Sequence, residues 1–120
     1  MSKTFEIKIN ENKSLKGSFW EANNPKSNLV IMTGMQEYSD RYADLAAFLN
    51  SKGITVYCLD AFWQGKNVDN VEDLQKWPLD AFRMNVTALH NLINKLKEDK
   101  LPVYLMGHSM GSFMVQSYLE

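Results

Sequence analysis

The sequence predicts an α/β fold built on a parallel sheet. Three continuously apolar runs rich in β-forming residues, at 29–33, 54–59 and 102–106, are typical of strands covered on both faces. The segments between these runs repeat apolar residues at helical spacing. Because consecutive parallel strands need a long crossover, usually a helix, this alternation favours the order β-α-β-α-β.

An antiparallel pair of strands is expected before the parallel ones. Apolar and polar residues alternate over 5–9, which is the period of a half-buried strand, and a second run with apolar residues follows at 15–20. The polar residues 11–13 separate the two runs. The N-terminus is therefore predicted to form a β-hairpin.

Two helices are predicted to connect the parallel strands. The first extends from about Asp40 to Ser51, with Gly53 at its exit. Its apolar residues at helical spacing are Tyr42, Leu45, Phe48 and Leu49. The second ends in lysine-rich sequence near Lys97, as the dipole at a helix C-terminus favours. Its apolar residues, three or four positions apart, are Leu79, Phe82, Val86, Leu89, Ile93 and Leu96.

The composition is that of an ordinary globular domain. The 120 residues are 45% hydrophobic and 22% charged, and the formal net charge of −1 gives no reason to expect nucleic acid or an anionic membrane as a partner. The single cysteine, Cys58, lies in an apolar run and is expected to be a buried small hydrophobe rather than a reactive thiol. No run has the length of a signal-peptide core or of a membrane span, so a cytoplasmic location is expected.

The motif that carries chemistry lies near the C-terminus. Residues 107–111 read Gly-His-Ser-Met-Gly, directly after an apolar run and before the amphipathic stretch 112–119. This order of strand, G-x-S-x-G and helix is the nucleophile elbow of serine hydrolases, with Ser109 as the nucleophile at the tip of a strained turn. A glycine-containing loop at a helix start is the alternative interpretation, and it explains neither the preceding strand nor the paired glycines.

A serine nucleophile needs a base for its proton and dipoles for the negative charge that develops on the attacked carbonyl. The backbone N–H of Met110, the residue after the nucleophile, is one expected donor. The other is expected in the loop after the first apolar run, where Met35 follows Gly34. The predicted site therefore consists of Ser109 and the oxyanion-hole N–H groups of Met35 and Met110, with no metal-binding or cofactor-binding residue.

The chain resembles the monoacylglycerol lipase and lysophospholipase branch of the α/β-hydrolases, the branch related to S33 serine aminopeptidases. The resemblance covers about residues 28–120 and depends on the elbow together with TGMQEYSDRY at 33–42. The family block reads His, Gly, two variable residues, Glu, His, Ser, one variable residue, Arg, Tyr. The matching positions are Gly34, Glu37, Ser39, Arg41 and Tyr42. The resemblance implies the N-terminal portion of a single α/β-hydrolase domain over 1–120, with an incomplete sheet.

Two positions depart from the family pattern. Thr33 stands where the family has a histidine that helps to brace the oxyanion loop. The family's Gly-His-Gly group after the second parallel strand is replaced by Trp63, Gln64 and Gly65. Trp63 would narrow the pocket or offer an apolar wall to an acyl chain. The alternative is that Trp63 and Trp77 only anchor the polar loop 61–78 to the domain.

The remaining titratable residues are not expected to complete a catalytic triad. His108 adjoins the nucleophile and is expected to be directed away from its hydroxyl, and His90 lies within the second predicted helix, where a structural or solvated role is expected. The resemblance implies that Asp60 braces a loop and is not the triad acid. Glu37 and Arg41 are expected to form a local ion pair.

The predicted function is hydrolysis of acyl esters of lipid-like substrates such as monoacylglycerols or lysophospholipids. The resemblance implies an acyl-serine intermediate and no cofactor. The 11 residues after Ser109 include no histidine or aspartate, so the expected whole is a domain of roughly 200 to 250 residues, and 1–120 alone is expected to be inactive. The expected partner is a small-molecule acyl ester, and transient contact with lipid surfaces is left open. The alternatives are a small-molecule esterase, thioesterase or peptidase, and a non-catalytic binding protein on the same fold.

Overall fold

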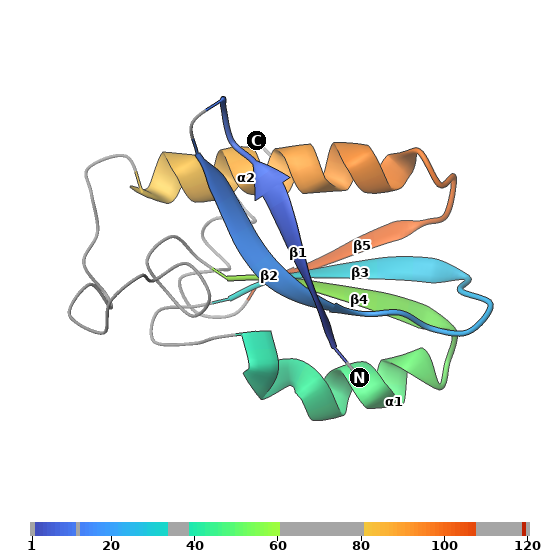
Figure 1. Cartoon of the computed structure of the whole chain (residues 1–120). Coiled ribbons are helices and arrows are strands. Elements are labelled where there is room, and N and C mark those ends of the chain that lie inside the picture. Colours follow the sequence, from blue (N-terminus) through green and yellow to red (C-terminus); the bar gives the residue numbers. More distant parts are fainter. Residues whose placement is uncertain (1, 12, 34–38, 61–80, 108–118, 120) are drawn as a thin grey trace.

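A computed structural model of the chain shows a mixed five-stranded sheet with helices on both faces (Figure 1). The structure describes residues 2–11, 13–33, 39–60, 81–107 and 119. The strands lie side by side in the order β1-β2-β4-β3-β5. Their bounds are β1 (Lys3–Lys8), β2 (Ser14–Trp20), β3 (Ser27–Met32), β4 (Ile54–Leu59) and β5 (Val103–Gly107).

The predicted N-terminal hairpin is confirmed. β1 pairs antiparallel with β2 over the full length of β1, and the Ile9 N–H donates to the Lys13 carbonyl at 2.9 Å to close the turn. β2 also pairs antiparallel with β4, with Phe19 opposite Tyr57. The hairpin is thereby joined to the parallel strands as one continuous sheet.

The parallel part of the sheet is centred on β3, as its unbroken apolar sequence predicts. β3 pairs in parallel with β4 on one side and with β5 on the other. Val30, Ile31 and Met32 are completely buried, because helices cover both faces of this strand. Cys58 is also fully buried, which agrees with its predicted role as a small hydrophobe.

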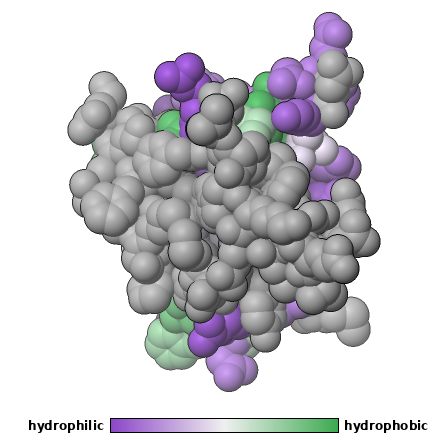
Figure 2. All heavy atoms as spheres, turned by 90° about the vertical axis from the view of Figure 1, so that its left-hand side faces the viewer, coloured by the Kyte–Doolittle hydropathy of each residue, from purple (hydrophilic) through white to green (hydrophobic). Residues whose placement is uncertain are grey.

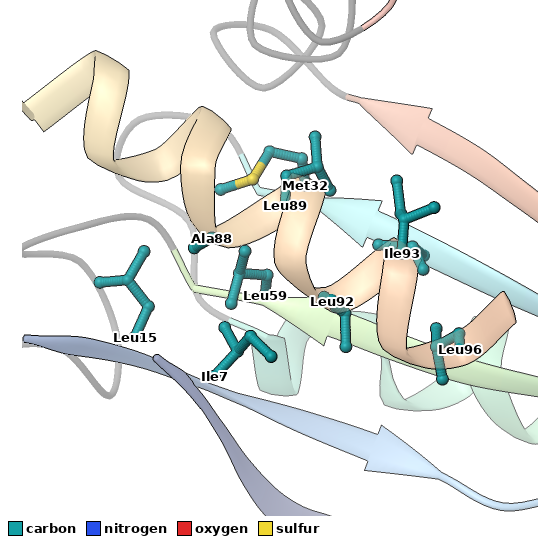
Figure 3. Close-up of a cluster of buried hydrophobic side chains, with 10 residues drawn as sticks. Ile7, Leu15, Met32, Leu59, Ala88, Leu89, Leu92, Ile93 and Leu96 are labelled. Carbon is teal, nitrogen blue, oxygen red and sulfur yellow. The ribbon is translucent and has the colours of Figure 1, made fainter. Parts of the chain in front are cut away.

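Helix α2 (Ala81–Lys97) covers one face of the sheet and builds the larger part of the core. Leu89, Leu92, Ile93 and Leu96 point from the helix toward side chains of strands β1, β2, β3 and β4 (Figure 3). Those sheet residues are Ile7, Leu15, Met32 and Leu59. The predicted apolar face of this helix is confirmed over 86–96, and Leu79 and the Phe82 side chain lie outside the described part.

The opposite face is covered by a short 3-10 helix, η1 (Ser39–Tyr42), and by α1 (Ala43–Asn50). Here the predicted apolar face is only partly correct, since Leu45 is 39% and Phe48 59% exposed while Ala46 is fully buried. A helix turns about 100° per residue, so Tyr42, Ala46 and Leu49 share one narrow sector and Phe48 falls on the far side. The small Ala46 side chain forms the contact with the sheet.

No helix in the described ranges is long and apolar enough to cross a membrane.

Gly17, in β2, lies directly against the backbone of β4. A Cβ atom at Gly17 would lie 2.2 Å from the Cys58 carbonyl oxygen and 2.8 Å from the Phe5 ring. At Gly53 the restriction is different, because φ is +83° while the nearest atom, in the Lys26 side chain, would be 3.5 Å away.

We expect Gly17→Ala to lower the free energy of unfolding by about 3 kcal/mol, because backbone must move to relieve the overlap. Gly53→Ala, the matched control, should cost about 1 kcal/mol for its left-handed backbone alone. Urea unfolding of both variants measures the difference. Equal costs at the two positions would contradict this account of Gly17.

Candidate active site

The carboxyl ends of β3, β4 and β5 meet at one edge of the sheet. Met32, the last residue of β3, pairs with Leu59 at the end of β4 and with Gly107 at the end of β5. Open sheets of parallel strands bind ligands beyond such an edge. Figure 2 looks onto this end of the molecule, where described residues, polar (purple) and hydrophobic (green), lie around the margins.

The residues predicted to do the chemistry, Ser109, Met35 and Met110, lie outside the described residues. The same is true of other residues considered above: Gly34, Glu37, Trp63, Gln64, Gly65, Trp77 and His108. The structure does describe the chain on both sides of segment 34–38 and the glycine at which β5 ends. The positions of these flanking residues, Thr33, Ser39 and Gly107, define the geometry at the carboxyl edge of the sheet.

Thr33, the residue that replaces the family histidine, is fixed to the end of β4. Its side chain is completely buried. Its hydroxyl donates to the Leu59 carbonyl oxygen at 3.1 Å, and its backbone N–H donates to the same oxygen at 3.4 Å. Segment 34–38 therefore starts from a residue that is bonded to the neighbouring strand.

Asp60 holds the other end of that segment. Its carboxylate is fully buried and accepts two hydrogen bonds from Ser39, one from the backbone N–H at 2.6 Å and one from the hydroxyl at 3.1 Å. Hydrogen bonds of this kind offset the cost of removing a carboxylate from water. The geometry agrees with the expectation that Asp60 braces a loop, because each carboxylate oxygen accepts from Ser39.

Ser18 extends this network into β2. Its hydroxyl lies 2.8 Å from the Ser39 hydroxyl, and both residues are fully buried. Because Ser39 donates its one hydroxyl proton to Asp60, the proton between the two serines comes from Ser18. A longer contact of 3.4 Å joins the Ser18 hydroxyl to Asp40. Strand β2, helix η1 and the end of β4 are thus bonded together.

The two ends of segment 34–38 are consequently held by two consecutive residues, Leu59 and Asp60. This is the segment in which the sequence predicts an oxyanion-hole donor. Such donors must be held rigidly to stabilise charge without reorganisation during the reaction. The arrangement fixes both flanking residues, Thr33 and Ser39, to the end of a sheet strand.

Ser18 was not recognised from the sequence. The one available signal is its place in the β2 alternation, on the same face as Trp20, where a buried residue is expected. A serine at a position facing the core needs a partner, and the partner comes from a residue 21 positions away.

His90 was predicted to have a structural or solvated role, and its side chain is solvated. It is exposed on α2, and its Nε2 atom lies 2.9 Å from the Asn94 side-chain nitrogen. Among the described residues, no group of three or more His, Cys, Asp or Glu side chains is placed to hold a metal ion.

The hairpin, the parallel strands with helices on both faces, and the strand that ends at G-x-S-x-G together define the N-terminal part of an α/β-hydrolase fold. The family described as serine aminopeptidase, S33, matches residues 23–120. The chain belongs to this family, which confirms the resemblance seen in the 33–42 block and the elbow.

Individual relatives agree with this assignment. A phospholipase of Bacillus subtilis, YtpA, is 29% identical over 101 residues, which are 84% of this chain and 37% of that protein. A monoglyceride lipase homolog of monkeypox virus is 33% identical over 91 residues, 73% of this chain and 31% of that protein. The chain thus spans about a third of the length of these two relatives.

A solved structure shows the same fold. The thermostable carboxyl esterase of Bacillus coagulans superposes with a TM-score of 0.82 at 22% identity, over 98% of this chain and 39% of the esterase. The described sheet therefore has the arrangement found in the corresponding part of an α/β-hydrolase.

Replacement of Asp60 by asparagine tests the brace. The amide keeps the shape of the side chain but removes the charge and turns one acceptor into a donor that faces the Ser39 donors. We expect Asp60→Asn to lower the free energy of unfolding by about 2 kcal/mol.

Asp44→Asn, on the exposed face of α1, is the control and should cost less than about 1 kcal/mol, the usual limit of a helix-dipole interaction. Chemical denaturation measures both variants. An Asp60→Asn variant as stable as the control would show that the Ser39 hydrogen bonds do not hold this edge.

Proposed function

We propose that the protein hydrolyses carboxylic esters with Ser109 as the nucleophile. The observation that carries the proposal is the strand register at the carboxyl edge. Gly107, which begins G-x-S-x-G, pairs with Met32, the residue directly before Thr33. The elbow sequence therefore starts beside Thr33, the anchored start of segment 34–38, which is the relation that a nucleophile and an oxyanion-hole loop require.

The proposed reaction has two stages. The Ser109 Oγ attacks the ester carbonyl carbon, its proton passes to a base, and the carbonyl oxygen becomes an oxyanion that accepts hydrogen bonds from the Met35 and Met110 N–H groups. Collapse of this intermediate breaks the bond to the alcohol, which leaves with the proton. Water then attacks the acyl-serine by the same steps and releases the acid.

The base and the acid that orients it are proposed to come from sequence after Glu120. His90 is exposed on α2, and Asp60 is engaged with Ser39, so neither is offered as a member of the triad. In this proposal the described residues position the oxyanion loop, and the whole protein carries out the turnover.

Lipid-like monoesters are the proposed substrate class. The names of the two relatives, a phospholipase and a monoglyceride lipase homolog, support this class. A small-molecule esterase is the second candidate, and its support is the superposition on a carboxyl esterase. The two candidates share the Ser109 chemistry and differ in how strongly a long acyl chain is bound.

Labelling with a fluorophosphonate tests the nucleophile. In the intact protein the probe should modify Ser109, and Ser109→Ala should abolish labelling and lower kcat by about a thousandfold or more. Ser112→Ala, three residues further along, is the matched control and should leave both unchanged. Persistent labelling and turnover in Ser109→Ala would refute the proposal, and absence of both from the unmodified protein would favour the non-catalytic alternative.

A series of monoacylglycerols of increasing chain length, with short-chain esters for comparison, tests the substrate class. Each methylene buried in an apolar acyl site contributes about 0.8 kcal/mol, so kcat/KM should rise about fourfold per methylene until the site is filled. A flat or falling series, with Ser109 still labelled, would identify a small-molecule esterase instead.

A further inference from the structure

A cavity of about 350 Å³ lies between the C-terminal half of α2 and strands β1, β2 and β4. Because α2 runs from the carboxyl edge of the sheet toward its opposite end (Figure 1), its C-terminal half, which lines the cavity, lies away from the candidate active site. Its apolar walls are formed by Phe5, Ile7, Phe19, Tyr57, Leu92 and Leu96. The volume is within the range of sites for small ligands, about 300 to 1,000 Å³.

Three aromatic rings make up one side of this cavity. Phe19 is stacked on Tyr57 with ring centroids 5.3 Å apart, and Phe5 meets both rings edge to face at 6.3 and 5.7 Å. The Lys3 ammonium lies 5.9 Å above the centre of the Phe19 ring. One cation of the chain thus already lies within cation–π distance of these rings.

Carboxylates dominate the mouth of the cavity. Glu98 and Asp99 line it, and among the described lining residues Lys95 carries the one positive charge. Glu6 alternates with Phe5 and Ile7 on β1, and its carboxylate accepts a hydrogen bond from the Ser14 hydroxyl on the other face. The turn after α2 holds two of these acids in place, because the N–H groups of Glu98 and Asp99 donate to the Lys95 and Leu96 carbonyls at 3.2 and 3.1 Å. The mouth therefore has a net negative charge next to an apolar interior.

The pKa of Tyr57, which lines the cavity, is also affected by nearby carboxylates. Burial raises the pKa of the Tyr57 phenol, and the carboxylates of Asp99 and Glu21 raise it further. Burial disfavours a charge of either sign, whereas the two carboxylates disfavour an anionic ligand and favour a cationic one.

We propose that this cavity binds an organic ammonium ion. The apolar body of the ligand packs against Leu92, Leu96 and the Phe5 ring, and the ammonium group lies at the mouth beside Glu98 and Asp99. Neutral molecules of the same shape gain the apolar contacts but not the charge, and carboxylates meet like charge. Binding at this site is independent of the ester hydrolysis proposed for Ser109.

Three probes with one apolar body test the proposal: phenylbutylammonium, phenylbutanol and phenylbutanoate. Calorimetric titration of the intact protein should show saturable binding of the ammonium about tenfold tighter than of the alcohol, and weaker binding of the carboxylate. NMR signals of the Tyr57 ring and of the Leu92 and Leu96 methyl groups should shift with the same titration curve.

The paired substitution Glu98→Gln and Asp99→Asn removes the charges without changing the walls. It should reduce the preference for ammonium over alcohol to about twofold, since only the aromatic contribution remains. Glu11→Gln with Asp44→Asn changes the net charge equally at exposed positions that do not line the cavity, and should leave the preference unchanged. The proposal is wrong if no probe saturates, if alcohol and ammonium bind equally, if the shifts occur elsewhere, or if the Glu98/Asp99 variant retains the full preference.

Discussion

The buried carboxylate of Asp60 is the constraint on which the candidate site depends. It accepts the backbone and hydroxyl hydrogens of Ser39, while the carbonyl of the preceding residue accepts both donors of Thr33. A carboxylate without such partners would be too costly to keep ionised inside the protein. The Ser39 hydrogen bonds that offset the cost of burying the Asp60 carboxylate therefore also fix one end of segment 34–38, and the Thr33 bonds to Leu59 fix the other.

This brace works because β4 is itself held on every side. β4 lies between β2 and β3, α2 covers the face that contains Leu59, and α1 covers the face that contains Val56 and Cys58. The hydrophobic core thus restricts the strand, and the strand restricts Thr33 and Ser39, the described residues on either side of segment 34–38.

Much of the fold could be predicted from local patterns. Alternation over 5–9 predicted the hairpin, and unbroken apolar runs predicted the parallel strands. The exposure of Leu45 and Phe48 was not predicted, because apolar residues in a helix do not by themselves show which sector meets the sheet. The aromatic cavity was not predicted either, since Phe5, Phe19 and Tyr57 come from three strands whose neighbours are set by topology.

By itself, the sequence determined the class of fold, the family and the candidate nucleophile, because these depend on periodicity and on short motifs read along the chain. Only the tertiary structure decided that β2 pairs with β4, that Ser18 joins Ser39 and Asp60, and that an acidic mouth lies over an aromatic wall. These features join residues distant in the chain. The strand register that brings them together results from simultaneous burial of both sheet faces, which no local segment specifies.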